Sequence, residues 1–176
     1  MVTNKSMKGR QASSYNKEDA KADVLAKART FTWLHMLGAK NLIVEAGSEI
    51  ELPYHRDLEC DLNGKHLILS AERKSAWMFG CGRFPYPEIN ILNRKSRECN
   101  KEKNLFTHFT VCSQDLRGIA LIRYEDYDIL DPIEIDTRRG PDWVRQVPIK
   151  KASFYRLIDE PNNVWERLAN NRWLTL

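Results

Sequence analysis

The sequence predicts one mixed α/β domain, and three observations support that fold class. The chain has 176 residues, of which 42% are hydrophobic and 30% charged, a balance typical of a folded protein with a buried core. An apolar pattern with helical spacing lies near the N-terminus. Several short extended runs, separated by turn residues, follow it. Together these features predict helices packed on a mixed sheet.

The first element is expected to begin at residue 17, after a basic arm. Residues 1–16 are polar and show no apolar periodicity, so we expect a flexible arm ahead of a single domain over residues 17–176. Gly38 stands where a helix that begins at residue 17 would end. Apolar residues recur at steps of three and four, and they predict a core-facing side made of Ala20, Val24, Ala28, Phe31, Leu34 and Leu37.

Strands and one further helix are expected after it. Asn63-Gly64 separates extended runs at residues 54–61 and 66–74, and this arrangement strongly indicates a hairpin. Residues 75–88 contain glycines and prolines and predict a long loop. The remaining expected features are strands at 42–45, 106–112, 119–124 and 143–149, a short helix within 89–103, and Trp165 and Trp173 as caps of the core.

Composition and motifs exclude several classes of protein. No apolar run approaches the ~18 residues of a membrane span and the first residues lack the apolar core of a signal peptide, so we expect a cytoplasmic protein without a membrane partner. The four cysteines form no Cys-x-x-Cys pair and no zinc-like spacing with the histidines, which indicates reduced thiols. The sequence contains no phosphate-loop, dinucleotide-binding or serine-hydrolase motif.

The net charge of +4 is concentrated at the N-terminus. Lys5, Lys8, Arg10 and Lys17 are the charged residues among the first 17, so the rest of the chain is neutral overall. A neutral body argues against a protein that coats nucleic acid over its whole surface. A local basic patch, or a substrate held by a metal and a few basic side chains, is compatible with it.

The end of the second hairpin strand combines charged groups with an apolar strand. Because side chains alternate along a strand, Glu72 and Lys74 share one face with Ser70. A carboxylate and an ammonium group at the end of an apolar strand are costly unless they have a partner or a function. The alternative is a charged strand tip that runs into solvent, as in a structural or interaction protein.

The hairpin geometry selects an acidic partner for Glu72. With the Asn-Gly pair as the two turn residues, Asp61 lies opposite His66, roughly 20 Å along the strand from Glu72. Asp57 then lies opposite Ser70 on the face of Glu72, about 7 to 8 Å from it between Cα atoms. Two carboxylates at that separation can share a divalent cation. Asp57 is therefore the preferred metal ligand, and Asp61 is the reserve ligand if a bulge shifts the register.

An aspartate, a hairpin and Glu-x-Lys at the end of its second strand resemble the PD-(D/E)XK nuclease superfamily. Arg56-Asp57 stands at the Pro-Asp position of that family, and Glu72-Arg73-Lys74 stands at its Glu-x-Lys. Residues 84–95, 106–112 and 144–149 also resemble small phage-type nuclease-like proteins, so the resemblance extends over residues 18–157. It implies a restriction-endonuclease-like core, in which a mixed β-sheet with a central catalytic hairpin is flanked by helices.

The sequence departs from the family pattern at three places. Arg56 replaces the proline before the aspartate. The first helix of the family often supplies a glutamate, but residues 26–30 of this chain read Ala-Lys-Ala-Arg-Thr, which leaves Glu45 of the first strand as the substitute. Arg73 occupies a position that is usually apolar. The missing helix glutamate and the neutral body favour, as an alternative, a binding module on the same fold that has lost or weakened catalysis.

The resemblance implies a metal-dependent endonuclease that hydrolyses DNA phosphodiester bonds, in phage or mobile-element DNA processing, recombination or repair. Asp57, Glu72 and the backbone carbonyl of Ala71 or Arg73 would bind Mg²⁺, with Mn²⁺ as a substitute. Lys74 would orient the attacking water or stabilise the transition state. If the protein is encoded by a phage, it would act in the host cytoplasm, and a homodimer is compatible with the family.

Basic and aromatic residues downstream of the catalytic strand are the candidates for contact with DNA. Lysine and arginine would hold the phosphate backbone, and aromatic rings would stack on bases. The alternative for the aromatic residues is that they anchor their loop to the domain. The DNA-binding candidates are Lys95, Arg94, Arg83, Tyr86 and Trp77, with Lys5, Lys8 and Arg10 of the arm, and Phe79 and Phe84 are further aromatic residues of the same loop.

Overall fold

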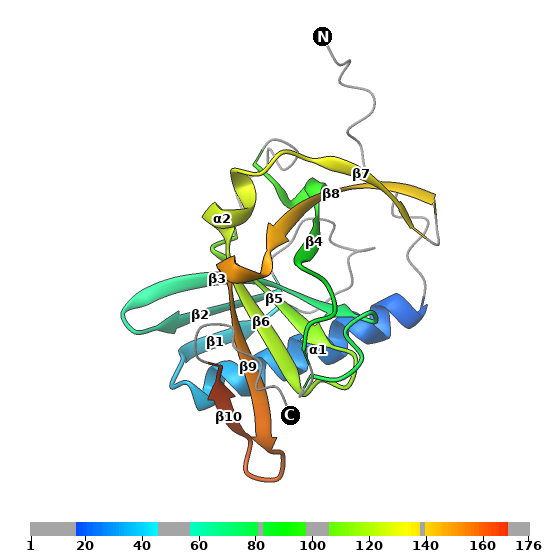
Figure 1. Ribbon diagram of the computed structural model, residues 1–176. Helices are drawn as coiled ribbons and strands as arrows, with labels where there is room; N and C mark the ends of the chain where they lie inside the picture. The colour runs from blue at the N-terminus through cyan, green and yellow to red at the C-terminus, as the bar shows by residue number, and fades with distance from the viewer. Residues whose placement is uncertain (1–16, 46–56, 81–82, 98–105, 138–139, 169–176) are drawn as a thin grey trace.

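The fold is mixed α/β and is built from two sheets and a long helix (Figure 1). The computed structural model describes residues 17–45, 57–80, 83–97, 106–137 and 140–168. The basic arm, residues 46–56 and Trp173 lie outside the described residues, and so do the expectations for them. Glu45 is described. None of the described helices is both long and apolar enough to cross a membrane.

Among the described residues the larger sheet has seven strands, and the predicted hairpin forms the second and third of them rather than its centre. The described pairing of β3 with β5 is parallel and the other described neighbours pair antiparallel, so the sheet is mixed as expected. In spatial order its strands are β1 (Lys40–Val44), β2 (Leu58–Leu62), β3 (Lys65–Lys74), β5 (His108–Ser113), β6 (Gly118–Arg123), β9 (Ala152–Asp159) and β10 (Val164–Arg167).

The smaller sheet lies over the larger one, on the side opposite the long helix (Figure 1). It consists of β4 (Glu88–Leu92), β8 (Gly140–Pro148) and β7 (Ile133–Thr137), and the short helix α2 (Tyr124–Asp128) packs beside it. Phe109 and Ile122 of the large sheet meet Ile89 and Val147 of the small sheet in one buried cluster. This packing leaves one face of β3 available to elements of the small-sheet side.

The long helix α1 (Lys17–Met36) packs on the other face of the large sheet. It ends at Met36, and Gly38 follows at the predicted capping position with a positive φ of 84°, which suits glycine, while the amide of Ala39 donates to the carbonyl of Leu34. The predicted core-facing side is confirmed for Leu34, Phe31 and Leu37, which lie in or against the buried cluster, and is wrong for Val24, which is 62% exposed, and for Ala28. The helix is rotated so that the buried positions are Ala26, Lys27, Thr30, Trp33 and Leu34.

The hairpin between β2 and β3 has the predicted turn and register. Asn63 and Gly64 both have positive φ, 52° and 74°, as a two-residue turn that matches strand twist requires. Asp61 pairs with His66, and no irregularity interrupts the pairing up to Leu58 and Leu69. The amide of Asp57 then donates to the carbonyl of Leu69, so Asp57 enters the hairpin directly before β2 begins.

Other expectations need correction. The helix expected within residues 89–103 is wrong for its described part, which forms β4 and a single 3-10 turn, η2 (Asn93–Lys95). Ile89 and Ile91 are fully buried and alternate with Asn90, so the period is that of a strand paired with β8. Residues 143–148 of the expected strand 143–149 lie within β8. It is not the last strand, because the 3-10 turn η3 (Ile149–Lys151), β9 and β10 follow.

The expectations that Trp165 caps the core and that the cysteines are reduced thiols can be compared with the described residues. Trp165 is 8% exposed and belongs to the cluster beneath α1, which confirms its place against the core. Cys60 and Cys112 are buried free thiols, and burial raises the pKa of Cys112 to about 12 despite a hydrogen bond with Thr30. Such thiols are inert rather than reactive.

Candidate functional site

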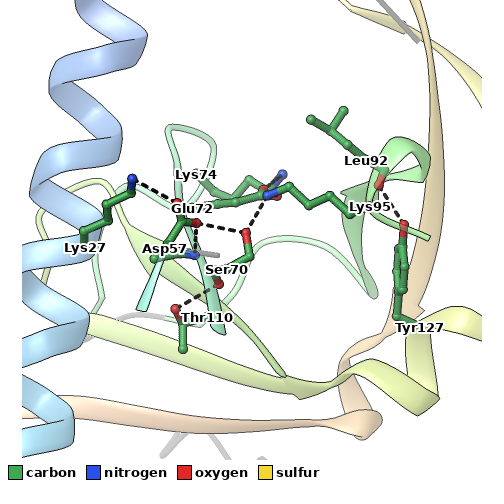
Figure 2. Close-up of polar contacts among 10 residues, drawn as sticks. Lys27, Asp57, Ser70, Glu72, Lys74, Leu92, Lys95, Thr110 and Tyr127 are labelled. Carbon is green, nitrogen blue, oxygen red and sulfur yellow. Dashed lines mark hydrogen bonds and ion pairs between the residues drawn. The ribbon is translucent and has the colours of Figure 1, made fainter. Parts of the chain in front are cut away.

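The face of β3 that carries Glu72 forms a compact cluster of charged side chains (Figure 2). Each carboxylate oxygen of Glu72 holds one lysine: Lys74 Nζ lies 2.8 Å from Oε2, and Lys95 Nζ lies 3.0 Å from Oε1. Lys95 comes from η2, directly after β4, and its side chain is 6% exposed. Lys95 is therefore brought onto β3 by the small-sheet side of the molecule.

Asp57 joins this cluster through Ser70. Its Oδ2 accepts a hydrogen bond of 2.7 Å from the amide of Ala71 and one of 3.1 Å from the hydroxyl of Ser70. The same hydroxyl accepts a bond of 2.6 Å from Lys95 Nζ, so Ser70 links the aspartate to the lysine that binds Glu72 (Figure 2). Asp57 and Glu72 thus lie on one face of the hairpin, as its register predicted.

Lys27 of α1 completes the cluster, and the sequence did not indicate it. Its Nζ lies 3.0 Å from Oδ1 of Asp57, with the lysine side chain only 10% exposed. Thr30, one turn later, shares a hydrogen bond of 3.2 Å with Thr110, which donates to the carbonyl of Ser70. A signal was present, since Lys27, Thr30 and Leu34 follow one helical stripe, but two polar members concealed it.

The charges of the cluster are unequal. Two carboxylates, of Asp57 and Glu72, face three ammonium groups, of Lys27, Lys74 and Lys95. Burial by itself would raise the pKa of Glu72, but the attraction of Lys74 and Lys95 outweighs it and holds that pKa far below its ordinary value. Glu72 is consequently ionised at any physiological pH, and the cluster carries a formal excess of one positive charge.

Asp61 is not part of the cluster. Its Oδ2 accepts from Asn41 at 2.7 Å, and its Oδ1 lies 2.9 Å from Nδ1 of His66 at the turn end of the hairpin. The reserve role for Asp61 required a shifted register, and the pairing of β2 with β3 is regular. The backbone of Glu45 lies beside that of Asp57, because the Glu45 amide donates to the carbonyl of Asp57 at 3.1 Å.

The DNA-binding candidates fall into different environments. Lys95 belongs to the cluster, Arg94 is partly buried beside it in the chain, and Arg83 and Tyr86 are exposed beside a shallow pocket that Phe84 and Ile149 also line. Lys5, Lys8 and Arg10 lie outside the described residues.

For Trp77 the stacking prediction is wrong. Its side chain is 1% exposed and packs edge-on against Phe84 and Phe154, so it offers no free ring face to a base. Phe79, two residues later in the same loop, is 67% exposed. The amide of Gln114 donates to the carbonyl of Trp77, and that of Gly80 donates to Asp115, so buried contacts hold both sides of the exposed segment.

The cluster contains two carboxylates, and each of their four oxygens has a protein partner. Magnesium favours oxygen ligands, is often held by one or two carboxylates and retains several waters. Asp57 and Glu72 supply such carboxylates on a single face. Within the described ranges, no group of three or more acidic, histidine or cysteine side chains could hold a metal ion.

No family model, curated protein or solved structure matches this chain. The protein is therefore described by its own fold and cluster. It is mixed α/β, and in a nearly buried cluster one aspartate and one glutamate contact three lysines.

Proposed function

We propose that the protein is a Mg²⁺-dependent endonuclease that hydrolyses DNA phosphodiester bonds on a restriction-endonuclease-like core. The observation that supports this proposal is that Lys74 contacts Glu72 on β3 and that Asp57 is linked to Glu72 through Ser70 and Lys95. Carboxylates that bind a cation and a lysine beside them are the groups that phosphodiester hydrolysis requires. The proposed setting is phage or mobile-element DNA processing, recombination or repair.

Asp57 and Glu72 would hold the metal ion, which lowers the pKa of a bound water and neutralises charge on the phosphate. Lys74 is the most exposed lysine of the cluster, with 28% of its side chain exposed, so it is the group placed to donate to water or a phosphate oxygen. Lys95 holds Glu72 and Ser70 in place from the other side. Burial of these contacts limits the freedom of the carboxylates.

DNA is the proposed partner, and its contacts are assigned to exposed groups of the segment that follows β3 in the chain. Phe79 and Tyr86 present rings to solvent, and Arg83 is exposed between them in sequence. An exposed ring can stack on a base, and arginine binds phosphate. We assign sequence-independent phosphate affinity to the arm. A homodimer would supply the two sites that cutting both strands requires.

A second candidate function is a DNA-binding module with weak or no catalysis. Lys27 favours it, because α1 presents an ammonium group to Asp57 where a further carboxylate would strengthen cation binding. The excess positive charge of the cluster favours a phosphate over a second cation.

The two candidates separate in one cleavage and binding experiment. Circular, linear, branched and single-stranded DNA are incubated with Mg²⁺ or Mn²⁺, with and without EDTA. Glu72→Gln removes a carboxylate of the site, and Glu134→Gln makes the same change on the exposed face of β7 as a control. Metal-dependent cleavage that only Glu72→Gln abolishes supports the nuclease.

DNA binding without cleavage by the unmodified chain supports the second candidate and contradicts the first. Absence of both binding and cleavage contradicts both candidates. Cleavage that persists in Glu72→Gln would remove the cluster from the mechanism, even though the protein would still be a nuclease.

A further inference from the structure

The segment that follows β3 exposes two large apolar side chains next to each other in the chain. Met78 is 57% exposed and Phe79 is 67% exposed. They stand between Trp77, which is 1% exposed, and Gly80, which is also buried. Residues 77–80 therefore form a short loop whose two ends are buried, and we call its exposed middle, Met78 and Phe79, the apolar tip.

Backbone contacts with the turn between β5 and β6 fix both ends of this loop. The carbonyl of Trp77 accepts from an amide of that turn at 2.7 Å, and the amide of Gly80 donates to Oδ1 of Asp115 at 2.8 Å. Gly80 also lies directly against the start of β6, since a Cβ atom at this position would overlap the backbone of Arg117 and Gly118. The apolar tip is thus held in an exposed position by its own anchors.

Positive charge without an ion-pair partner lies at the same end of the large sheet. Arg73 is the last residue but one of β3, and Arg117 directly precedes β6. Because Lys74 pairs with Ser113, the end of β3 lies beside the turn that leads to β6. The Nε atoms of both arginines are buried and lack a hydrogen-bond partner, and within the described part of the chain neither guanidinium group forms an ion pair.

We propose that the apolar tip inserts between two base pairs of double-stranded DNA and kinks the duplex, while Arg73 and Arg117 hold the phosphates beside the kink. This inference rests on DNA as the partner in the proposed function, and it requires no metal ion. Proteins that kink DNA commonly insert apolar side chains, phenylalanine and methionine among them, between base steps.

Insertion requires an apolar group that is exposed and fixed before binding. Unstacking a base step costs free energy, and a loop that had to be ordered at the same time would add the entropy cost of its ordering. The anchors at Trp77 and Gly80 order this loop in the free protein. Insertion is then favoured, because it removes two apolar side chains from water.

The charges near the apolar tip favour nucleic acid over a membrane as the partner. Guanidinium groups present donors in a fixed geometry that matches phosphate oxygens. A phosphate would supply the negative charge that Arg73 and Arg117 do not find among the described residues. Membrane-surface elements are typically amphipathic helices with a broad apolar face, whereas this tip has two apolar side chains.

The composition of the loop favours a duplex over a single strand. Proteins that bind single strands stack successive bases on several aromatic rings along a groove. This loop offers one exposed ring, that of Phe79, beside the aliphatic side chain of Met78, because Trp77 is buried. One ring and one methionine, adjacent on a fixed loop, have the size and chemistry of a wedge for a single base step.

The test is the bending of a duplex of about 30 base pairs with a central TA step, which unstacks easily. Energy transfer between dyes at the two ends reports bending, and the fluorescence of 2-aminopurine at the step reports unstacking. All measurements are made in EDTA, so neither cleavage nor a cation contributes. We expect the unmodified chain to increase both signals. In Phe79→Ala we expect both increases to be lost and the duplex affinity to fall about tenfold.

Three further variants serve as controls. Ile129→Ala removes an apolar side chain that is 76% exposed outside the loop, and it should leave both signals and the affinity unchanged. Phe79→Leu keeps an apolar wedge without an aromatic ring, and it should retain the bending. Arg117→Gln should weaken binding and reduce the slope of affinity against salt by about one, with the bend retained.

Folding of each variant is checked by circular dichroism and thermal melting. Phe79 is exposed, so its replacement should leave Tm nearly unchanged. If Phe79→Ala does not fold, Met78→Ala decides the question. Reduced bending in that variant supports the inference, and unchanged bending contradicts it.

The outcomes distinguish this inference from the proposed function. Unchanged bending in Phe79→Ala, or duplex binding by the unmodified chain without bending, overturns the insertion and leaves DNA as the partner. An equal loss of affinity for single-stranded and duplex DNA in Phe79→Ala assigns the ring to base stacking and also overturns it. Absence of all DNA binding overturns the inference together with the proposed partner. Binding to phosphatidylserine vesicles that Phe79→Ala abolishes, with the duplex affinity unchanged, assigns the tip to a membrane and overturns the inference.

Discussion

The two ends of the β2–β3 hairpin carry similar groups in different environments. At the turn end, His66 lies between Asp61 and Glu59, with ring nitrogens 2.9 and 2.7 Å from their carboxylates, and 55% of its side chain is exposed. At the other end, Glu72 lies between Lys74 and Lys95 with only 15% of its side chain exposed. In each case one side chain lies between two others, and His66 has the opposite charge to its neighbours only when it is protonated.

The difference between the ends is the covering by other elements. The α1 helix and the η2 turn add Lys27 and Lys95 to the strand end, whereas at the turn end Asn41 of the neighbouring strand β1 donates to Asp61. Covered ion pairs are weakly screened, and loss of one partner is costly. Exposed pairs contribute little. Hydrogen-bonded charges are therefore evidence for a functional site only where tertiary packing encloses them.

The largest expected effect on stability is that of Lys95→Met. This change leaves Glu72 and Ser70 without a buried donor, and we expect a loss of about 3 kcal/mol in the free energy of unfolding. Urea unfolding followed by circular dichroism measures it. Lys65→Met, at the exposed turn end of β3, is the control. A loss no greater than that of the control would mean that the covered end is no different from the exposed end.

The two aspartates of the hairpin should differ in cation binding. Asp57→Asn removes a carboxylate from the covered cluster, and we expect at least a tenfold loss of Mn²⁺ affinity, on the order of 1.4 kcal/mol. Asp61→Asn makes the same change at the turn end and should leave the affinity unchanged. Isothermal titration with Mn²⁺ compares them. Equal losses in both variants would return Asp61 to the list of ligands and weaken the assignment of Asp57.

Acid should affect the covered end through Glu72. Its pKa is lowered in the folded protein, so its ion pairs contribute stability that is present above the ordinary value of 4.5 and is lost as the pH falls below it. We expect the stability difference between the unmodified protein and Glu72→Gln to be constant near neutral pH and to shrink in acid. Urea titrations over this range measure it, and a difference that grows in acid would contradict the assignment.

The smallest effect is expected at His66. Hydrogen bonds to Asp61 and Glu59 raise its pKa above the ordinary 6.5. A raised pKa contributes stability that is present below 6.5 and is lost as the pH rises through the folded value. His66→Gln should therefore be slightly less stable than the unmodified protein at about pH 6 and equal to it at about pH 9. Thermal melts at both pH values compare them, and added salt should reduce the difference.

The sequence by itself determined the parts of the site that depend on local rules. Asn63-Gly64 specifies a tight turn, the turn specifies the register, and strand alternation then puts Asp57 and Glu72 on one face. Gly38 likewise stands at the predicted capping position after the first helix, with a positive φ. Each of these follows from backbone geometry over a few residues, and for that reason it can be read without knowledge of the rest of the chain.

Only the tertiary structure decided which side chains reach that face from a distance. Lys27 lies 30 residues before its partner Asp57, and Lys95 lies 23 residues after Glu72. Apolar periodicity predicted a buried face for α1 that omits Lys27, because it assigns lysine to solvent. Burial of Lys27 is favourable only because Asp57 lies opposite it. Residues 89–92 became a strand because β8 offers a pairing edge. Local pattern specifies elements and faces, and long-range pairing of charge and backbone specifies the completed site.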